Sequence, residues 1–188
     1  MWEQIRSLKC MREAGHTVVE VEPKLQKLHG ENFKYKSSNK DENARSDIKC
    51  LGFWSKMRQA FFDVKIVSPL ARSNCNMPIS NLLESAEKSK SREYRERIVS
   101  VEHGDFNPLV FTTSGAMGPQ CQIVLRRLAE KICERQSLQR SVVSGWLRCR
   151  LSFALLRTTL LCVRGTRRKA YNNENNILLA VSASRIEH

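Results

Sequence analysis

The fold of this chain is decided by the run Ala-Phe-Phe-Asp-Val-Lys-Ile-Val at residues 60–67, in which one acid and one base interrupt an apolar stretch. Phenylalanine, valine and isoleucine favour a half-buried strand, and the run has strand length. Side chains on a strand alternate between its faces, so Asp63 and Lys65 point the same way. Such a pair is costly to bury unless it serves a metal ion and a phosphate. The simpler alternative is a charged pair that faces solvent.

Periodicity and turn residues predict the elements on either side of this run. Gly15 ends an amphipathic helix, and Pro23 stops an alternating β-branched strand. Residues 30–43 and 69–78 are polar or proline-bounded and are expected to be loops. The expected elements are a helix over 2–14, strands over 17–22, 44–53 and 60–67, a charged, solvent-exposed helix over 80–101, a strand over 109–113, and helices over 120–134 and from 138 or 141 to 163.

The connections between these elements predict how the sheet is built. The strands over 44–53 and 60–67 are close in sequence, so they are expected to pair as an antiparallel hairpin at the centre of the sheet. The helix over 80–101 is long enough to cross over and return the strand over 109–113 parallel to its neighbour. A mixed sheet between helices follows, which is a three-layer α/β architecture.

Composition narrows the class of partner. The chain has 188 residues, with 32 Lys and Arg against 19 Asp and Glu, and a formal net charge of +13. This excess favours a polyanion, most often nucleic acid, over an acidic membrane surface or a protein. Seven cysteines without a C-x-x-C pair indicate reduced thiols in an intracellular compartment rather than a zinc site. The apolar run 151–163 is too short to span a membrane and contains Arg157, so no membrane association is expected.

A second acid can join Asp63 across the predicted hairpin. Asp47 begins the preceding strand, and residues 48–62 between the two acids are a suitable length to bring them side by side. Two adjacent carboxylates repel each other unless a divalent cation lies between them. Carboxylate oxygens suit Mg²⁺, which keeps several waters and takes further ligands from phosphate. Lys65 would then orient or deprotonate the attacking water, or stabilise charge on the phosphorus centre.

Several phrases of the sequence resemble a known family. They are Ala-Arg-Ser-Asp-Ile at 44–48, Gly-Phe-Trp at 52–54, the run 60–67, Val-Glu-His-Gly at 101–104, Pro-Leu-Val-Phe at 108–111 and Trp-Leu-Arg-Cys-Arg-Leu-Ser-Phe at 146–153. With the element order and the D-x-K motif, they resemble the PD-(D/E)XK restriction-endonuclease-like superfamily. The similarity is closer to endonuclease-like segments at the ends of metazoan retroelement polyproteins.

The resemblance implies a restriction-endonuclease-like α-β-β-β-α-β core over residues 1–115, a C-terminal basic helical pair over 116–170 packed on that core, and a tail over 171–188. It also implies Mg²⁺- or Mn²⁺-dependent hydrolysis of DNA phosphodiester bonds in the nucleus. Asp47, Asp63 and Lys65 match the family motif, with both acids as metal ligands.

The sequence also departs from the family pattern. Ser46 stands where the superfamily has its proline. The third acid is not fixed: Glu20 and Glu22 share a strand face, Glu22 is the chosen candidate, and Glu13 is a rival. No reverse-transcriptase pattern is present, so a retroelement-derived chain would be a fragment or a free-standing copy. Such a copy can lose activity while keeping its core residues.

Basic residues in the C-terminal third are candidates for gripping a DNA or RNA backbone, and their alternative role is to solvate helix faces and helix ends. They are Arg126, Arg127, Arg148, Arg150, Arg164, Arg167, Arg168 and Lys169.

Three functions therefore stay open: a metal-dependent endonuclease, a nucleic-acid-binding module with weak or no catalysis, and a host-adopted interaction protein. Convergence of Asp47, Asp63 and Lys65 in a basic groove would favour the enzyme. If Asp63 faces a packed helix, the binding module is favoured.

Overall fold

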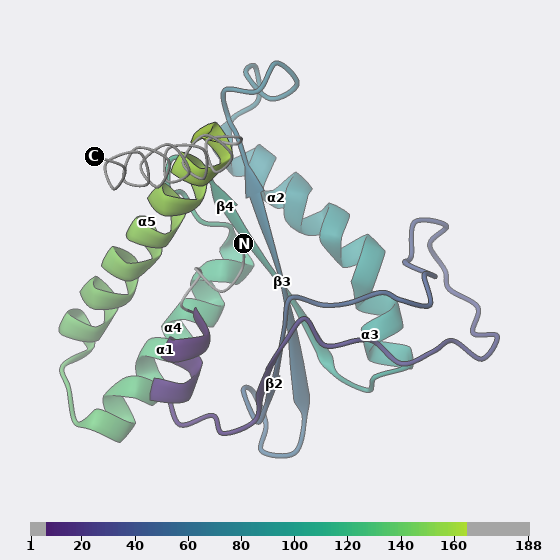
Figure 1. Cartoon of the computed structure of the whole chain (residues 1–188), viewed down its shortest axis with the longest axis horizontal. Helices are drawn as coiled ribbons and strands as arrows, with labels where there is room; N and C mark the ends of the chain where they lie inside the picture. Colours follow the sequence, from purple (N-terminus) through teal and green to yellow (C-terminus); the bar gives the residue numbers. More distant parts are fainter. Residues whose placement is uncertain (1–6, 165–188) are drawn as a thin grey trace, which may run out of the picture.

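A computed structural model describes residues 7–164 of the chain (Figure 1). A mixed sheet lies between helices, as the sequence predicts for an α/β protein. The elements are α1 (Ser7–Glu13), β1 (Val19–Val21), β2 (Ile48–Leu51), β3 (Gln59–Val67), α2 (Ile79–Lys90), the π-helical segment η2 (Ser91–Arg95), α3 (Glu96–Ser100), β4 (Asp105–Thr112), α4 (Pro119–Gln136) and α5 (Arg140–Arg164).

The four strands lie in the order β1-β2-β3-β4. β2 is antiparallel to both β1 and β3, and the β2–β3 hairpin occupies the centre of the sheet. β4 runs parallel to β3 after the crossover through α2, η2 and α3, with Asp63 opposite Pro108 and Lys65 opposite Val110. The predicted hairpin and the predicted crossover are therefore both confirmed.

The two faces of the sheet carry different cores. On one face, Phe62 and Val64 belong to the largest apolar cluster, together with residues of α1 and α4. α5 lies outside α4 and contributes Leu147 and Leu155 to the same cluster, while its Phe153 is exposed. The other face is covered by α2 and α3 (Figure 1). There Phe61 packs with Ile98 of α3, and Val110 packs with residues of α2.

Two strands begin four residues away from their predicted starts. The strand predicted from Ala44 begins at Ile48, because the Asp47 carboxylate accepts the N–H of Val64 and takes a place that a backbone carbonyl would fill. The strand predicted after Pro108 begins at Asp105 and includes the proline. β4 lies at the edge of the sheet, where a residue without an N–H leaves no ladder partner unpaired.

The helix predicted over 80–101 is interrupted by η2, and the expectation that its charges are solvent-exposed is wrong for Lys90 and Arg97. Residues 86, 90, 94 and 98 are four apart and lie on the covered side of this segment. In a regular α-helix with 3.6 residues per turn, such a series drifts around the axis. A π-helical turn contains more residues, so it keeps the series facing the sheet.

Arg97 holds the long loop that follows β1. Its guanidinium is fully buried and donates to the carbonyls of Gln26 at 2.9 Å, Asn39 at 3.1 Å and Asp41 at 2.7 Å. The neighbouring Glu96 carboxylate accepts the N–H of Lys34 at 2.6 Å. The loop predicted over 30–43 is therefore fixed against α3 by charged groups rather than by apolar packing.

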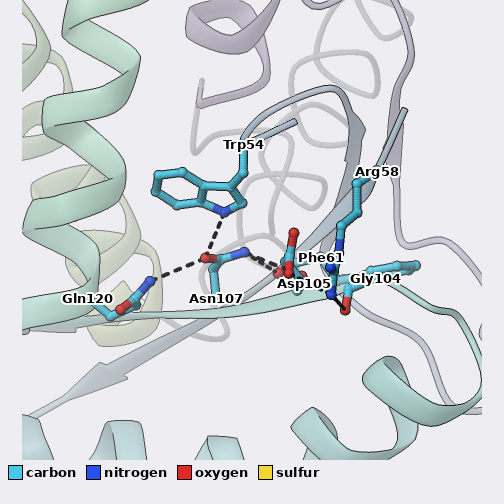
Figure 2. Close-up of polar contacts among 7 residues, drawn as sticks. All are labelled: Trp54, Arg58, Phe61, Gly104, Asp105, Asn107 and Gln120. Atoms are coloured by element: carbon cyan, nitrogen blue, oxygen red, sulfur yellow. Dashed lines mark hydrogen bonds and ion pairs between the residues drawn. The ribbon is translucent and has the colours of Figure 1, made fainter. Parts of the chain in front are cut away.

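Asn107 joins β3, β4, α4 and the turn after β2 (Figure 2). Its buried amide oxygen accepts from Trp54 Nε1 at 3.1 Å and Gln120 Nε2 at 3.2 Å. Its amide nitrogen donates to the carbonyls of Phe61 and Asp105, each at 3.3 Å. All four hydrogen-bonding positions of this side chain are thus used, which makes Asn107 a single-residue junction between four segments.

The Asn107 junction predicts a stability change. Asn107→Ala should lower the free energy of unfolding by about 2–3 kcal/mol, because a buried carbonyl and several donors lose their partner. Asn81→Ala, at an exposed position on α2, should change it by less than about 0.5 kcal/mol. Urea denaturation of both variants measures the difference. Equal losses in the free energy of unfolding would mean that the buried Asn107 network contributes no more stability than an exposed polar side chain.

Candidate functional site

Three acids form a row across one end of the sheet: Glu22 directly follows β1, Asp47 directly precedes β2, and Asp63 lies within β3. The register pairs Val21 with Ile48 and Ile48 with Phe62. One step further along the strands, Glu22 lies opposite Asp47 and Asp47 lies opposite Asp63. The N–H of Glu22 donates to the carbonyl of Asp47 at 2.8 Å, which continues the ladder at this step. Directly opposed residues share a face of the sheet, so the prediction that Asp47 lies beside Asp63 agrees with this register.

Burial of the three acids increases along the row, from Glu22 at the surface to Asp63 in the core. Glu22 is exposed, Asp47 is half-buried and Asp63 is 5% exposed. Glu22 has a positive φ of 48° and lies 3.6 Å from the guanidinium of Arg45. The solvent end of the row is therefore at β1, and its buried end is on the central strand β3.

Asp63 meets a residue that the sequence did not single out. Nζ of Lys90, the last residue of α2, lies 2.9 Å from Oδ2 of Asp63, and both side chains are largely buried. Within the described part of the chain, the Lys90 ammonium is the partner of Oδ2, and no other donor reaches this oxygen. Asp63 therefore faces a packed helix, and not an open groove.

Burial and charge act against each other in this pair. Burial raises the pKa of Asp63, and Lys90 opposes that rise. Burial also acts to lower the pKa of Lys90, but Asp63 and Glu93 outweigh it, so the pKa of Lys90 is raised overall. Lys90 is consequently a cation at neutral pH, and its charge is the main compensation for the buried carboxylate.

Asp47 has a different environment. Its Oδ2 accepts the N–H of Val64 at 2.6 Å. Burial raises the pKa of Asp47 to about 6, and the charges of Asp63 and Glu22 add to the rise against the opposing effects of the Val64 hydrogen bond and Lys90. The other two carboxylates of the row therefore make Asp47 harder to ionise.

Lys65 lies on the same face, two residues from Asp63, and is half-buried. Its charge lowers the pKa of Asp63, although it is the last of the effects on that group. Within residues 7–164, the Lys65 ammonium forms no hydrogen bond or ion pair. Its ammonium is thus available beside the row, whereas that of Lys90 is engaged.

The neighbours of Lys90 complete the site. Nζ of Lys90 is 3.8 Å from the carboxylate of Glu93 and 5.1 Å from the ring centre of Tyr94. Sequence reasoning missed these residues because a helix rich in Glu, Lys and Arg is normally solvated on its charged side. The signal that could have found them is the four-residue spacing of Ala86, Lys90, Tyr94 and Ile98.

The donor set fits a magnesium ion only in part. Among the described residues, no three His, Cys, Asp or Glu side chains come together as a metal-binding group. Asp47 and Asp63 would therefore supply two ligands, which suits an ion that keeps several waters and binds phosphate. Oδ2 of Asp63 is an oxygen of the required kind, but the Lys90 ammonium lies 2.9 Å from it. Glu22 lies at the far, exposed end of the row.

The rival third acid is excluded from the row. Glu13 of α1 lies 3.0 Å from the guanidinium of Arg150, a contact between α1 and α5 on the opposite side of the sheet. This contact also ties up Arg150, which stacks on Trp146 at 4.3 Å. Arg150 is thus a structural cation rather than an exposed one.

The other predicted basic residues divide into two groups. Arg126 and Arg148 are exposed and line a cavity of about 170 Å³ between α4 and α5, with Arg140 beside them. Arg127 is paired with Glu130 at 3.8 Å. Arg164 ends α5. Arg167, Arg168 and Lys169 lie outside the described residues.

A larger cavity lies elsewhere. It has a volume of about 820 Å³, runs along α2, η2 and α3 beside β4, and is lined by Arg92, Arg95 and Phe106, among others. None of the acids of the row borders it. The candidate residues are therefore grouped by the sheet and not by an existing cavity.

No protein-family model matches the chain, and no curated protein matches it either. In the part of the chain from 7 to 164, none of the helices is both long enough and apolar enough to cross a bilayer.

The raised pKa of Asp47 predicts a pH-dependent stability difference. The stabilising contribution of this group is fully present below its unfolded pKa of 3.8 and is lost as the pH rises through about 6. Asp47→Asn stays neutral and keeps an oxygen for the Val64 N–H. In a chelator at pH 7.5, it should therefore raise the free energy of unfolding by about 1–3 kcal/mol, with the gain vanishing near pH 4.

Chemical denaturation at the two pH values provides the measurement. Glu42→Gln removes an equal charge from an exposed loop position and serves as the matched control. A gain of the same size at both pH values would show that the charge of Asp47 is not its cause.

Proposed function

We propose that this chain is a metal-dependent, endonuclease-like protein of retroelement origin with a restriction-endonuclease-like core, which hydrolyses DNA phosphodiester bonds with Mg²⁺ or Mn²⁺. The observation that carries the proposal is the row of Glu22, Asp47 and Asp63 across adjacent strands, with Lys65 on the same face. Asp63 and Glu22 both raise the pKa of Asp47, and carboxylates this close are costly to keep ionised without a cation between them.

Each residue of the row then has a role. Asp47 and Asp63 would hold the ion, which when bound acts as a Lewis acid on the phosphate and lowers the pKa of its water. Lys65 would orient the attacking water or stabilise the charge that develops on the phosphate oxygens. Glu22, at the solvent end, would face the water or substrate that enters the row. The free ammonium of Lys65 supports its part in this assignment.

DNA is the proposed partner, with RNA as the alternative, and the nucleus is the corresponding location. The net charge of +13 supports a polyanionic partner. Arg126 and Arg148 are the predicted contacts best placed to reach a phosphate backbone, because both are exposed and neither pairs with an acid within residues 7–164. Their position between α4 and α5 is separate from the acidic row.

A second candidate function is nucleic-acid binding without catalysis. It is favoured by the condition stated for it from the sequence, because Asp63 faces the packed helix α2, where Lys90 already compensates its charge. A site closed in this way cannot bring both carboxylates to a substrate phosphate unless Lys90 moves. The endonuclease is kept as the first proposal because Asp47 lies opposite Asp63 with Lys65 on the same face, the arrangement that a metal-dependent nuclease needs. The two candidates share the fold and the basic surface. They differ only in whether the acidic row catalyses phosphodiester hydrolysis.

Nicking of supercoiled plasmid with Mg²⁺ or Mn²⁺ separates these candidates. Wild type should nick DNA, Asp63→Asn should be inactive, and Lys65→Ala should lose a factor of about 100–1000 in rate while still binding metal. Glu42→Gln is the control and should be fully active. Wild-type protein that binds DNA but leaves it intact with either metal would support the binding module instead.

DNA affinity should fall linearly with salt on logarithmic axes, because bound cations release counterions from the backbone. The double variant Arg126→Gln, Arg148→Gln should reduce the slope by about 2 if both residues contact phosphates. Arg150→Gln, whose side chain is held by Glu13, should leave the slope unchanged. Fluorescence anisotropy at several salt concentrations tests this, and an unaltered slope in the double variant would place the contact surface elsewhere.

A further inference from the structure

We propose that Lys90 is the resident counter-cation of the acidic row, and that a divalent ion must displace its ammonium from Asp63 in order to bind there. This inference rests on the proposed function in taking Asp63 as a metal ligand. The contact between Lys90 Nζ and Asp63 Oδ2 is 2.9 Å, and the side chains are 19% and 6% exposed. At this distance and depth, the ammonium occupies the space beside Oδ2 that a second cation would need.

The pair differs from a purely structural salt bridge. A buried ion pair contributes to stability only when further hydrogen bonds satisfy its remaining atoms. Within the described residues, Oδ2 of Asp63 is contacted by the Lys90 ammonium alone, and no backbone or other side-chain donor holds it. The oxygen thus keeps a lone pair that a metal ion can use.

Lys90 also has an alternative position. Glu93, one turn along the helical segment, places its carboxylate 3.8 Å from Nζ, and the ring of Tyr94 lies 5.1 Å from it. An ammonium that leaves Asp63 can therefore remain paired with Glu93 and over an aromatic face. A metal that displaces Lys90 would therefore not leave its ammonium buried without a partner. This condition must hold if one cation is to replace another at the Asp63 carboxylate.

Two cations cannot share the buried oxygen at contact distance, because their mutual repulsion is strong away from water. Removing the ammonium should therefore tighten metal binding. This expectation is opposite to that for a lysine that merely supports the fold, whose loss would disorder Asp63 and weaken metal binding.

The experiment compares Mn²⁺ alone binding to the full chain and to its Lys90→Met and Lys88→Met variants by titration calorimetry. Lys88 carries the same charge two residues away, is exposed, and within residues 7–164 pairs only with Glu84, at 3.5 Å. Lys90→Met should bind Mn²⁺ about tenfold more tightly or better than wild type. Lys88→Met should stay within about twofold of wild type, because a surface charge is screened.

Lys90→Arg covers the case in which the methionine variant fails to fold. It keeps the positive charge next to Asp63, so its Mn²⁺ affinity should not exceed that of wild type. Thermal unfolding with and without Mn²⁺ gives a second readout: the metal should raise the melting temperature of Lys90→Met more than that of wild type. Equal or weaker Mn²⁺ binding by Lys90→Met, or no binding by any of the proteins, would overturn the proposal.

These outcomes are independent of the plasmid assay. If wild type nicks DNA but the affinity for Mn²⁺ does not depend on Lys90, the nuclease proposal stands and the counter-cation proposal fails. If Lys90→Met gains affinity but no protein nicks DNA, the counter-cation proposal stands and hydrolysis is excluded.

Discussion

The placement of a carboxylate inside the central strand is the constraint on which this structure depends. A charge at the Asp63 position is costly to bury, and the chain meets the cost with one ammonium from the helix above it. α2 must therefore end next to Asp63, and it must be oriented so that Lys90 faces the sheet. The crossover helix is positioned by an ion as much as by its apolar residues Leu83 and Ala86.

This constraint also explains the contrast between the two faces of the sheet. The face toward α1 and α4 is covered by a continuous apolar cluster. The face toward α2 and α3 combines small apolar clusters with buried charges, which require specific partners and fixed distances. The π-helical segment belongs to this second face, since a regular helix would turn Tyr94 and Ile98 away from the residues they cover. Irregular helical geometry is therefore found where the packing is polar.

Sequence alone was sufficient for the sheet and for part of the site. Side chains along 60–67 alternate between the two faces of the sheet, and the short hairpin sets the pairing of its two strands. Together these features predict that Asp47 lies beside Asp63. Lys90 and Arg97 could not be predicted in the same way. A charged residue in a charged helix has no local feature that marks it as buried, and its burial depends on tertiary partners distant in the chain. The only sign of the π turn in the sequence is that the covered positions 86, 90, 94 and 98 keep a strict four-residue spacing.

The Arg97 contacts have a consequence for the order in which the chain folds. They connect the guanidinium to carbonyls 56, 58 and 71 residues earlier in the chain. Closing a loop of that length costs entropy before any of the three contacts forms. The segment between β1 and β2 therefore acquires its shape only after α3 has docked on the sheet. During synthesis, this segment is made well before Arg97, so it cannot adopt its final conformation until Arg97 is in place. Its ordering is therefore set by the docking of the crossover helices and not by its local conformational propensity.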